Sequence, residues 1–269
     1  MRTLINILIA ASLFFLSFQL SAQPYFHPGS TLLVGTESLN VRESDDIDAQ
    51  VQDQLTFGQE VLILSMSENY FSSNDRSYPF VEIRYQKEGE EKRGFVWAGL
   101  LAVDHVYEGN TLYLLKHSKG GDLTDLSAIF ELYKWEEGVL NKLHQISYEG
   151  LELDLLEHIS LHILQAKGLE NVERVFQINI SHLACCSSED QLYFLEHSKQ
   201  ELFPLAPINN IFCDGELPRF EYHFPEDQIG EKATILLTET EYDLEGNVHN
   251  RKFVKRISWV DGEVALRTK

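Results

Sequence analysis

The sequence predicts an all-β, mainly antiparallel fold: a small barrel followed by a larger antiparallel β domain, either a sandwich or propeller-like. Short runs rich in β-branched and aromatic residues recur along the chain, and most are bounded by Gly, Asn, Asp or Ser. No helix-length segment separates these runs, which favours antiparallel sheets over an alternating α/β fold. Hydrophobic residues make up 43% of the chain, so a sizeable core is available.

The first 22 residues have the three parts of a secretory signal peptide. Arg2 supplies a positive charge, an apolar run extends from Leu4 to Phe18, and the small residues Ser21 and Ala22 end the segment. The run is short for a membrane span, and no cysteine follows it for lipid attachment. An uncleaved N-terminal anchor is the alternative. We expect residues 1–22 to be removed, which leaves a periplasmic or secreted protein without a stable membrane span.

The charge balance limits the possible partners. The chain carries 22 basic and 42 acidic residues, a net charge of −20. Such a balance repels nucleic acid and anionic lipid. It suits either plain solubility or a cationic partner.

Several segments before residue 170 have the composition of strands. Five of them are Glu60–Ser65, Phe80–Tyr85, Gly94–Trp97, Thr111–Leu115 and Ile129–Trp135. A sixth, from Leu151 to Ile163, alternates apolar and polar residues except at Leu156 and Glu157. A helix would also bring apolar residues together there, but the period of two fits better, so we expect a strand with a bulge or turn at the exception.

Near the C-terminus, the residues Ala233–Tyr242 and Lys252–Val260 flank the polar segment Asp243–Asn247. This pattern predicts a β-hairpin with a loop longer than two residues. Phe253, Ile257 and Trp259 are expected on one face of the second strand, with basic side chains on the other.

One internal similarity stands out. Leu112–Lys119 and Leu192–Lys199 agree at six of eight positions, eighty residues apart. Duplication of a β unit would explain the match. Chance agreement between two strands of common composition would explain it too, and the flanking residues match poorly.

Ser38–Leu101 resembles the bacterial SH3-like domain, a small barrel found in many exported bacterial proteins. The tetrad Leu39–Arg42 and the strand Gly94–Trp97 carry most of the resemblance, and Gly58 supplies a turn between them. We therefore expect an SH3-like domain over residues 30–103 and an uncharacterised antiparallel β domain over residues 105–269.

The resemblance implies ligand recognition by the barrel loops, where this chain departs from the family. Glu43–Asp46 replaces a loop that usually contains Gly-Pro, and an insertion from Ser67 to Tyr78 is expected to lengthen another loop. Tyr70, Tyr78 and Trp97 are candidate ligand-contacting aromatics, with packing in the core or at its rim as the alternative. The aspartates of the first loop lack the spacing of a calcium site, so a solvated acidic loop is expected; they are Asp45, Asp46 and Asp48.

The chain has three cysteines, Cys185, Cys186 and Cys213, an odd number for a disulfide framework. Neighbouring cysteines bond only with strain, so we expect one of the pair to bond Cys213. A catalytic thiol within Ala184–Ser188 would need a nearby histidine, and no pattern for one follows. A disulfide or structural role is favoured, and no catalytic residue is assigned.

Histidine pairs offer no convincing metal site. His158 and His162 would be about 13 Å apart on a strand, too far to share an ion. His117 and His197 occupy equivalent places in the two similar segments and are expected at surface strand ends. We expect no metal and no cofactor.

These observations favour an exported, non-catalytic binding or assembly module of the cell envelope. Its partner would be a peptide, a glycan or a basic protein. The alternatives are an envelope hydrolase with its site in the C-terminal domain, and an acidic inhibitor or immunity-type protein.

Overall fold

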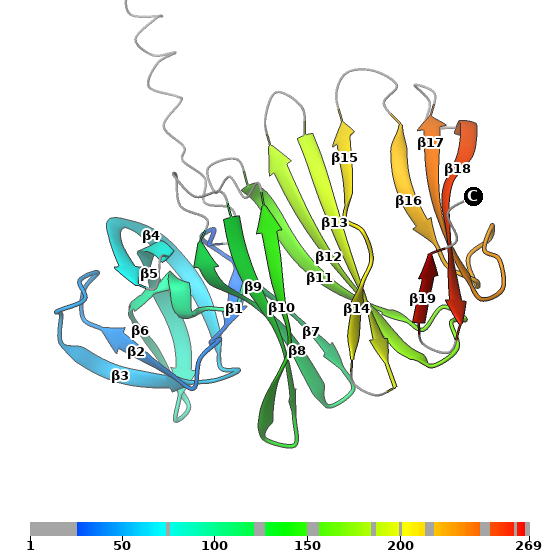
Figure 1. Cartoon of the computed structure of the whole chain (residues 1–269). Coiled ribbons are helices and arrows are strands. Elements are labelled where there is room, and N and C mark those ends of the chain that lie inside the picture. Colours follow the sequence, from blue (N-terminus) through cyan, green and yellow to red (C-terminus); the bar gives the residue numbers. More distant parts are fainter. Residues whose placement is uncertain are drawn as a thin grey trace, which may run out of the picture.

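The prediction of an all-β, mainly antiparallel fold is confirmed. The computed structural model describes residues 26–73, 76–120, 127–149, 156–183, 187–198, 201–212, 218–242, 248–260 and 263–266. In these ranges nineteen strands form four antiparallel sheets, and a single 3-10 turn, η2 (Ala98–Leu100), joins the first sheet to the rest (Figure 1). Across the same ranges, no helix has the length and apolarity that a membrane span requires.

The first sheet curls into a half-barrel in the strand order β1-β4-β5-β6-β2-β3. Its strands are β1 (Thr31–Leu33), β2 (Ser38–Arg42), β3 (Val51–Thr56), β4 (Glu60–Ser73), β5 (Arg76–Lys87) and β6 (Glu90–Trp97). Strands β2 and β6 meet at Arg42 and Phe95. Gly94 allows this approach, because a Cβ atom there would lie 2.4 Å from Val41 Cγ1 and 2.9 Å from the Arg42 carbonyl oxygen.

The prediction of a long loop between Ser67 and Tyr78 is wrong. Strands β4 and β5 continue through this segment as a hairpin, in which Phe71 pairs with Tyr78 and Ser73 with Arg76. The serines and asparagines suggested a loop, but the aromatic residues among them pair across the two strands and extend the ladder.

Three further sheets follow, and the change from the half-barrel falls between Leu101 and Asp104. The second sheet contains β7 (Asp104–Glu108), β8 (Thr111–Gly120), β9 (Ser127–Glu136) and β10 (Val139–Glu149). The third contains β11 (Leu156–Gln165), β12 (Val172–Leu183), β13 (Ser187–His197), β14 (Leu202–Pro204) and β15 (Ile208–Phe212). The fourth contains β16 (Arg219–His223), β17 (Thr234–Tyr242), β18 (Val248–Val260) and β19 (Glu263–Leu266).

The sheets pack face to face in a row, with the half-barrel at one end and the fourth sheet at the other (Figure 1). On β8, Leu112 and Leu114 pack toward the half-barrel, while Tyr113 points the other way and meets Phe176 of the third sheet. On β13, Tyr193 likewise points to the following sheet, where it meets Tyr222. The two similar segments therefore form interior strands that present an equivalent tyrosine to the next sheet.

Both later predictions of strands are confirmed in the described residues. Strand β11 has its irregularity between Leu156 and His158, where the alternation fails. Strands β17 and β18 pair antiparallel, and their connection, 243–247, lies outside the described residues.

The face predicted for Phe253 is wrong. Ile257 and Trp259 are buried as expected, but Phe253 is 48% exposed. The register between β17 and β18 shifts at Leu237 and Thr238, and the extra residue in β18 turns Phe253 to the opposite face.

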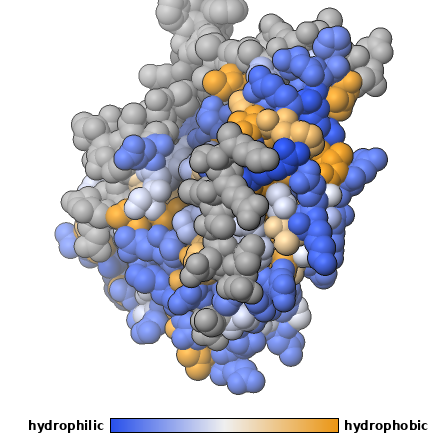
Figure 2. Space-filling model, turned by 45° about the vertical axis from the view of Figure 1, so that its right-hand side comes forward, coloured by the Kyte–Doolittle hydropathy of each residue, from blue (hydrophilic) through white to orange (hydrophobic). Residues whose placement is uncertain are grey.

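The surface around the fourth sheet is mainly hydrophilic, with separate hydrophobic patches (Figure 2). Among the described side chains of this part of the chain, the exposed large apolar residues are Ile211, Val248, Phe253 and Val254. Scattered apolar residues are normal for a protein surface, so they do not by themselves mark a binding site.

Candidate functional site

A pocket of about 240 Å³ opens on the half-barrel, where the acidic loop after β2 meets the hairpin of β4 and β5. Some of the residues that line this pocket were singled out from the sequence. Its lining is Asp45, Asp46, Ile47, Asn69, Tyr70, Phe71 and Phe80.

The bulge in β4 places two of these side chains at the pocket. Met66 pairs with Val81 and Tyr70 pairs with Pro79, so two extra residues of β4 lie between them. Pro79 has no N–H to offer the ladder at this point. The bulge brings Asn69 and Tyr70 to the acidic loop.

The acidic loop is tied to that bulge by hydrogen bonds. One oxygen of Asp45 accepts from Ser67 Oγ and, at 3.0 Å, from Asn69 Nδ2. The Asp46 carboxylate accepts at 2.8 Å from the Asp48 backbone N–H, which closes a tight turn. The loop is therefore held in one conformation, with both carboxylates beside the pocket.

The pocket has an aromatic floor and an exposed aromatic rim. Phe80 is buried, and Phe71 packs edge-on against Trp97 with 5.4 Å between ring centroids. Tyr70 is 49% exposed, and Ile47 lines the same pocket. Aromatic rings beside carboxylates make a surface that attracts a cation and covers its apolar stem.

Of the three aromatic candidates, Tyr70 lines the pocket, whereas Tyr78 and Trp97 are core residues. Tyr78 is 2% exposed and hydrogen-bonds to Nδ1 of His117 on β8. Trp97 is 7% exposed, and its indole N–H donates to the Phe71 carbonyl at 2.9 Å. Neither ring reaches the surface to meet a ligand; both hold the hairpin against the rest of the protein.

Arg76 fixes the turn end of the same hairpin. Its guanidinium is buried, stacks 5.0 Å from the Trp97 ring and donates to the carbonyls of Gly99 and His117. Burial lowers the pKa of Arg76, and the nearby charge of Glu131 opposes that change. The hairpin that carries Tyr70 is thus anchored to both the half-barrel and the second sheet.

Within the described part of the chain, no basic side chain lines the pocket, and neither Asp45 nor Asp46 takes part in an ion pair. The two carboxylates therefore leave a local negative charge at an aromatic pocket. A protonated amine or guanidinium on a flexible stem has the charge and the shape for it.

The remaining candidate residues lie elsewhere. Cys185, Cys186 and Cys213 fall outside the described residues, so their pairing stays a prediction. His117 and His197 are buried, which overturns the expected surface position, and they pack against different neighbours, Phe130 and Phe203. His158 and His162 lie on β11, and within the described ranges no three His, Cys, Asp or Glu residues gather as a metal site would require.

Four further lining residues were not predicted from the sequence: Ile47, Asn69, Phe71 and Phe80. Ile47 carried a weak signal, because an apolar residue between aspartates contradicts a purely solvated loop. Asn69 and Phe71 are placed by a bulge whose position depends on the pairing of two strands.

No model of a known protein family matches the chain, and no curated protein matches it significantly.

Proposed function

We propose that this chain is an exported, non-catalytic binding module that captures a lysine or arginine side chain of a peptide or basic protein at the half-barrel pocket. The observation that carries the proposal is the pair Asp45 and Asp46 beside the exposed ring of Tyr70. The sequence of residues 1–22 supports export, and the resemblance to the SH3-like family supports a binding role.

The size of the pocket favours a side chain over a larger ligand. A volume of about 240 Å³ is below the range of about 300–1,000 Å³ that is usual for sites that enclose whole small molecules. A single cationic side chain would lay its methylenes along Tyr70 and direct its charge to the carboxylates.

The charge of the whole chain supports the same partner. A net charge of −20 raises the encounter rate with a basic partner and disfavours an acidic one. An inhibitor or immunity-type role uses the same chemistry and is the form this function takes if the partner is a basic enzyme.

Tetralysine and tetraarginine, with tetraglutamate as the charge control, test the proposal by isothermal titration calorimetry at two salt concentrations. Asp46→Asn and Tyr70→Ala should each weaken binding by about fivefold or more, which corresponds to about 1 kcal/mol. Asp48→Asn is the matched control, because it removes the same charge from the same exposed loop but lies outside the pocket lining.

Equal weakening by Asp46→Asn and Asp48→Asn would show only a general charge attraction and would overturn the assignment of the pocket. Absence of binding to either cationic peptide at low salt would overturn the proposed function itself.

A further inference from the structure

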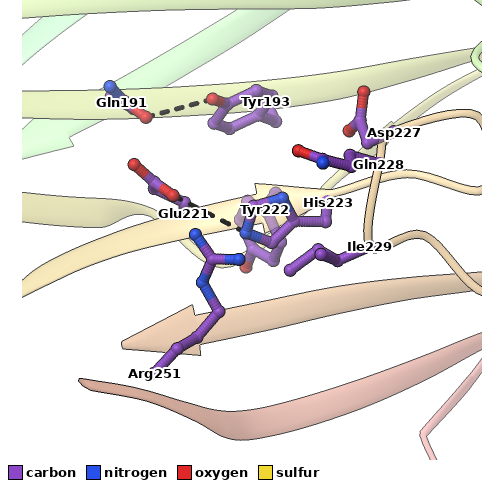
Figure 3. Close-up of a pocket in the computed structure, with 9 residues that line it drawn as sticks. All are labelled: Gln191, Tyr193, Glu221, Tyr222, His223, Asp227, Gln228, Ile229 and Arg251. Atoms are coloured by element: carbon purple, nitrogen blue, oxygen red, sulfur yellow. Dashed lines mark hydrogen bonds and ion pairs between the residues drawn. The ribbon is translucent and has the colours of Figure 1, made fainter. Parts of the chain in front are cut away.

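A second, larger pocket lies between the third and fourth sheets (Figure 3). Its volume is about 420 Å³, within the range of about 300–1,000 Å³ for small-molecule sites. Side chains converge on it from β13, from β16, from the turn after β16 and from β18. Its lining includes Tyr193, Glu221, His223, Asp227, Gln228 and Arg251.

One of the two acids in the pocket is already neutralised. Asp227 accepts the Phe224 backbone N–H at 2.7 Å and pairs with the Lys167 ammonium at 3.1 Å. It shapes the turn after β16 and has no charge left to offer a ligand.

The remaining charges are balanced. Glu221 accepts the Tyr242 hydroxyl at 3.0 Å and lies 3.6 Å from His223 Nε2. Burial lowers the pKa of His223 despite the opposing charge of Glu221, which favours the neutral imidazole. This leaves one carboxylate, on Glu221, and one guanidinium, on Arg251, among the side chains that line the pocket (Figure 3).

Arg251 and Gln228 both offer hydrogen-bonding groups to the pocket. Arg251 uses only Nε within the described residues, to Thr240 Oγ1 at 3.2 Å, so its terminal nitrogens are available. Gln228 makes no hydrogen bond to another described residue and lies on the turn that borders the pocket. The rings of Tyr193 and Tyr222 provide an apolar wall 5.3 Å apart at their centroids.

The geometry does not favour hydrolysis by a hydroxyl nucleophile. His223 Nε2 is 2.9 Å from Thr238 Oγ1, but Thr238 is fully buried and cannot reach a substrate. Glu221 approaches the same nitrogen, so it does not orient the imidazole from the far side as the acid of a catalytic triad does.

We propose that this pocket binds a small, uncharged polyhydroxylated ligand, a mono- or disaccharide. A net-neutral lining that offers donors from Arg251 and Gln228 and an acceptor from Glu221 matches hydroxyl groups, each of which both donates and accepts. A singly charged ligand would leave one of the two flanking charges opposed by a like charge. The site is separate from the half-barrel pocket, so it adds a second ligand to the proposed function.

The test is a titration of the purified protein with maltose and with N-acetylglucosamine, followed by the backbone amide signals of residues 221–224 and 226–229 in NMR spectra. Arg251→Met should weaken binding by about tenfold, because it removes charged donors. Lys252→Met is the matched control: this neighbour is exposed, pairs with Glu239 at 2.7 Å and does not line the pocket. It should leave the affinity unchanged within about twofold.

Equal effects of Arg251→Met and Lys252→Met, or binding of free glycine and glutamate in place of both sugars, would overturn the proposal. So would the absence of any shift with either sugar. Because Tyr70→Ala lies at the other end of the molecule, it should leave sugar binding unchanged, and this variant separates the failure of one pocket from the failure of the other.

Discussion

Strands β8 and β13 share a sequence pattern, yet one buries its tyrosine completely and the other uses it to line a pocket. Tyr113 is 0% exposed, packs 5.2 Å from Phe176 and has no hydrogen-bond partner for its hydroxyl among the described residues. Tyr193 packs against Tyr222, and its hydroxyl donates to Gln191 at 3.0 Å beside the pocket. The strand sequence therefore sets the direction of the tyrosine, and the following sheet decides whether a site forms there.

Two arginines account for much of the contrast. Arg174 lies over the Tyr113 ring and is bonded to Glu108 at 2.5 Å and Glu196 at 2.8 Å, so it covers the tyrosine. Arg251 is exposed and keeps its terminal nitrogens for other partners. Strands β8 and β13 are thus similar in sequence, but they lie beside different charge clusters. The cluster of Arg174 beside Tyr113 is closed, and the cluster of Arg251 near Tyr193 is open.

Removing a packed aromatic residue near Tyr113, or one near Tyr193, should have the largest effect on stability. Phe176→Ala next to Tyr113 and Trp259→Ala on β18, in the same core cluster as Tyr193, should each lower the free energy of unfolding by about 3–5 kcal/mol, because both residues are nearly inaccessible. Urea unfolding followed by tryptophan fluorescence and circular dichroism measures the loss. A loss below about 1 kcal/mol would mean that the sheets do not pack as described.

The two arginines should differ in their contribution to stability. Arg174→Met should cost about 3 kcal/mol, because it leaves the Glu196 carboxylate, whose side chain is 5% exposed, without its cation. Arg251→Met should change stability by less than about 0.5 kcal/mol, because its side chain is exposed. Similar losses from the two variants would contradict the contrast between a closed and an open cluster.

Removing the two tyrosine hydroxyls should change stability in opposite directions. Tyr113→Phe should be neutral or stabilising by up to about 1 kcal/mol, since it deletes a buried hydroxyl that has no hydrogen-bond partner among the described residues. Tyr193→Phe should destabilise by about 1 kcal/mol, since it deletes the bond to Gln191. Chemical denaturation of both variants at pH 7 measures the pair, and a loss of equal size in both would contradict the assignment.

The smallest expected effect is a pH dependence of stability that arises from His223, which lines the same pocket as Tyr193. Burial lowers the pKa of His223 below its ordinary value of 6.5 in the folded state, so the unfolded chain binds this proton first. Stability should therefore fall as pH drops below 6.5 and level off below the folded pKa. His223→Gln should flatten this part of the stability profile between pH 7.5 and 5.5, and an unchanged slope would show that another group is responsible.

Much of the fold was predictable because its signals are local. Strand composition, the alternation around Leu156 and the polar segment after Tyr242 each depend on neighbouring residues. The segment from Ser67 to Tyr78 was mistaken for a loop because its pairing depends on aromatic residues on both strands of the hairpin.

The sites were harder to predict because they combine distant segments. Tyr70 was a candidate, but only the β4 bulge shows that it meets Asp45 and Asp46. Tyr78 and Trp97 were candidates for the same reason as Tyr70, because they are aromatic residues of the same segment, Ser38–Leu101. They are buried by contacts with His117 and Arg76. Glu221, His223 and Arg251 carry no local motif, and they come together only through the pairing of β16, β17 and β18.

The most direct test of the central claim is an NMR titration of the purified protein with tetralysine, read residue by residue. We expect saturable shifts confined to residues 45–47 and 69–71, weakened by salt and lost in Tyr70→Ala. Shifts spread over the acidic surface without saturation, or an unperturbed spectrum at low salt, would contradict a cation-binding pocket on the half-barrel.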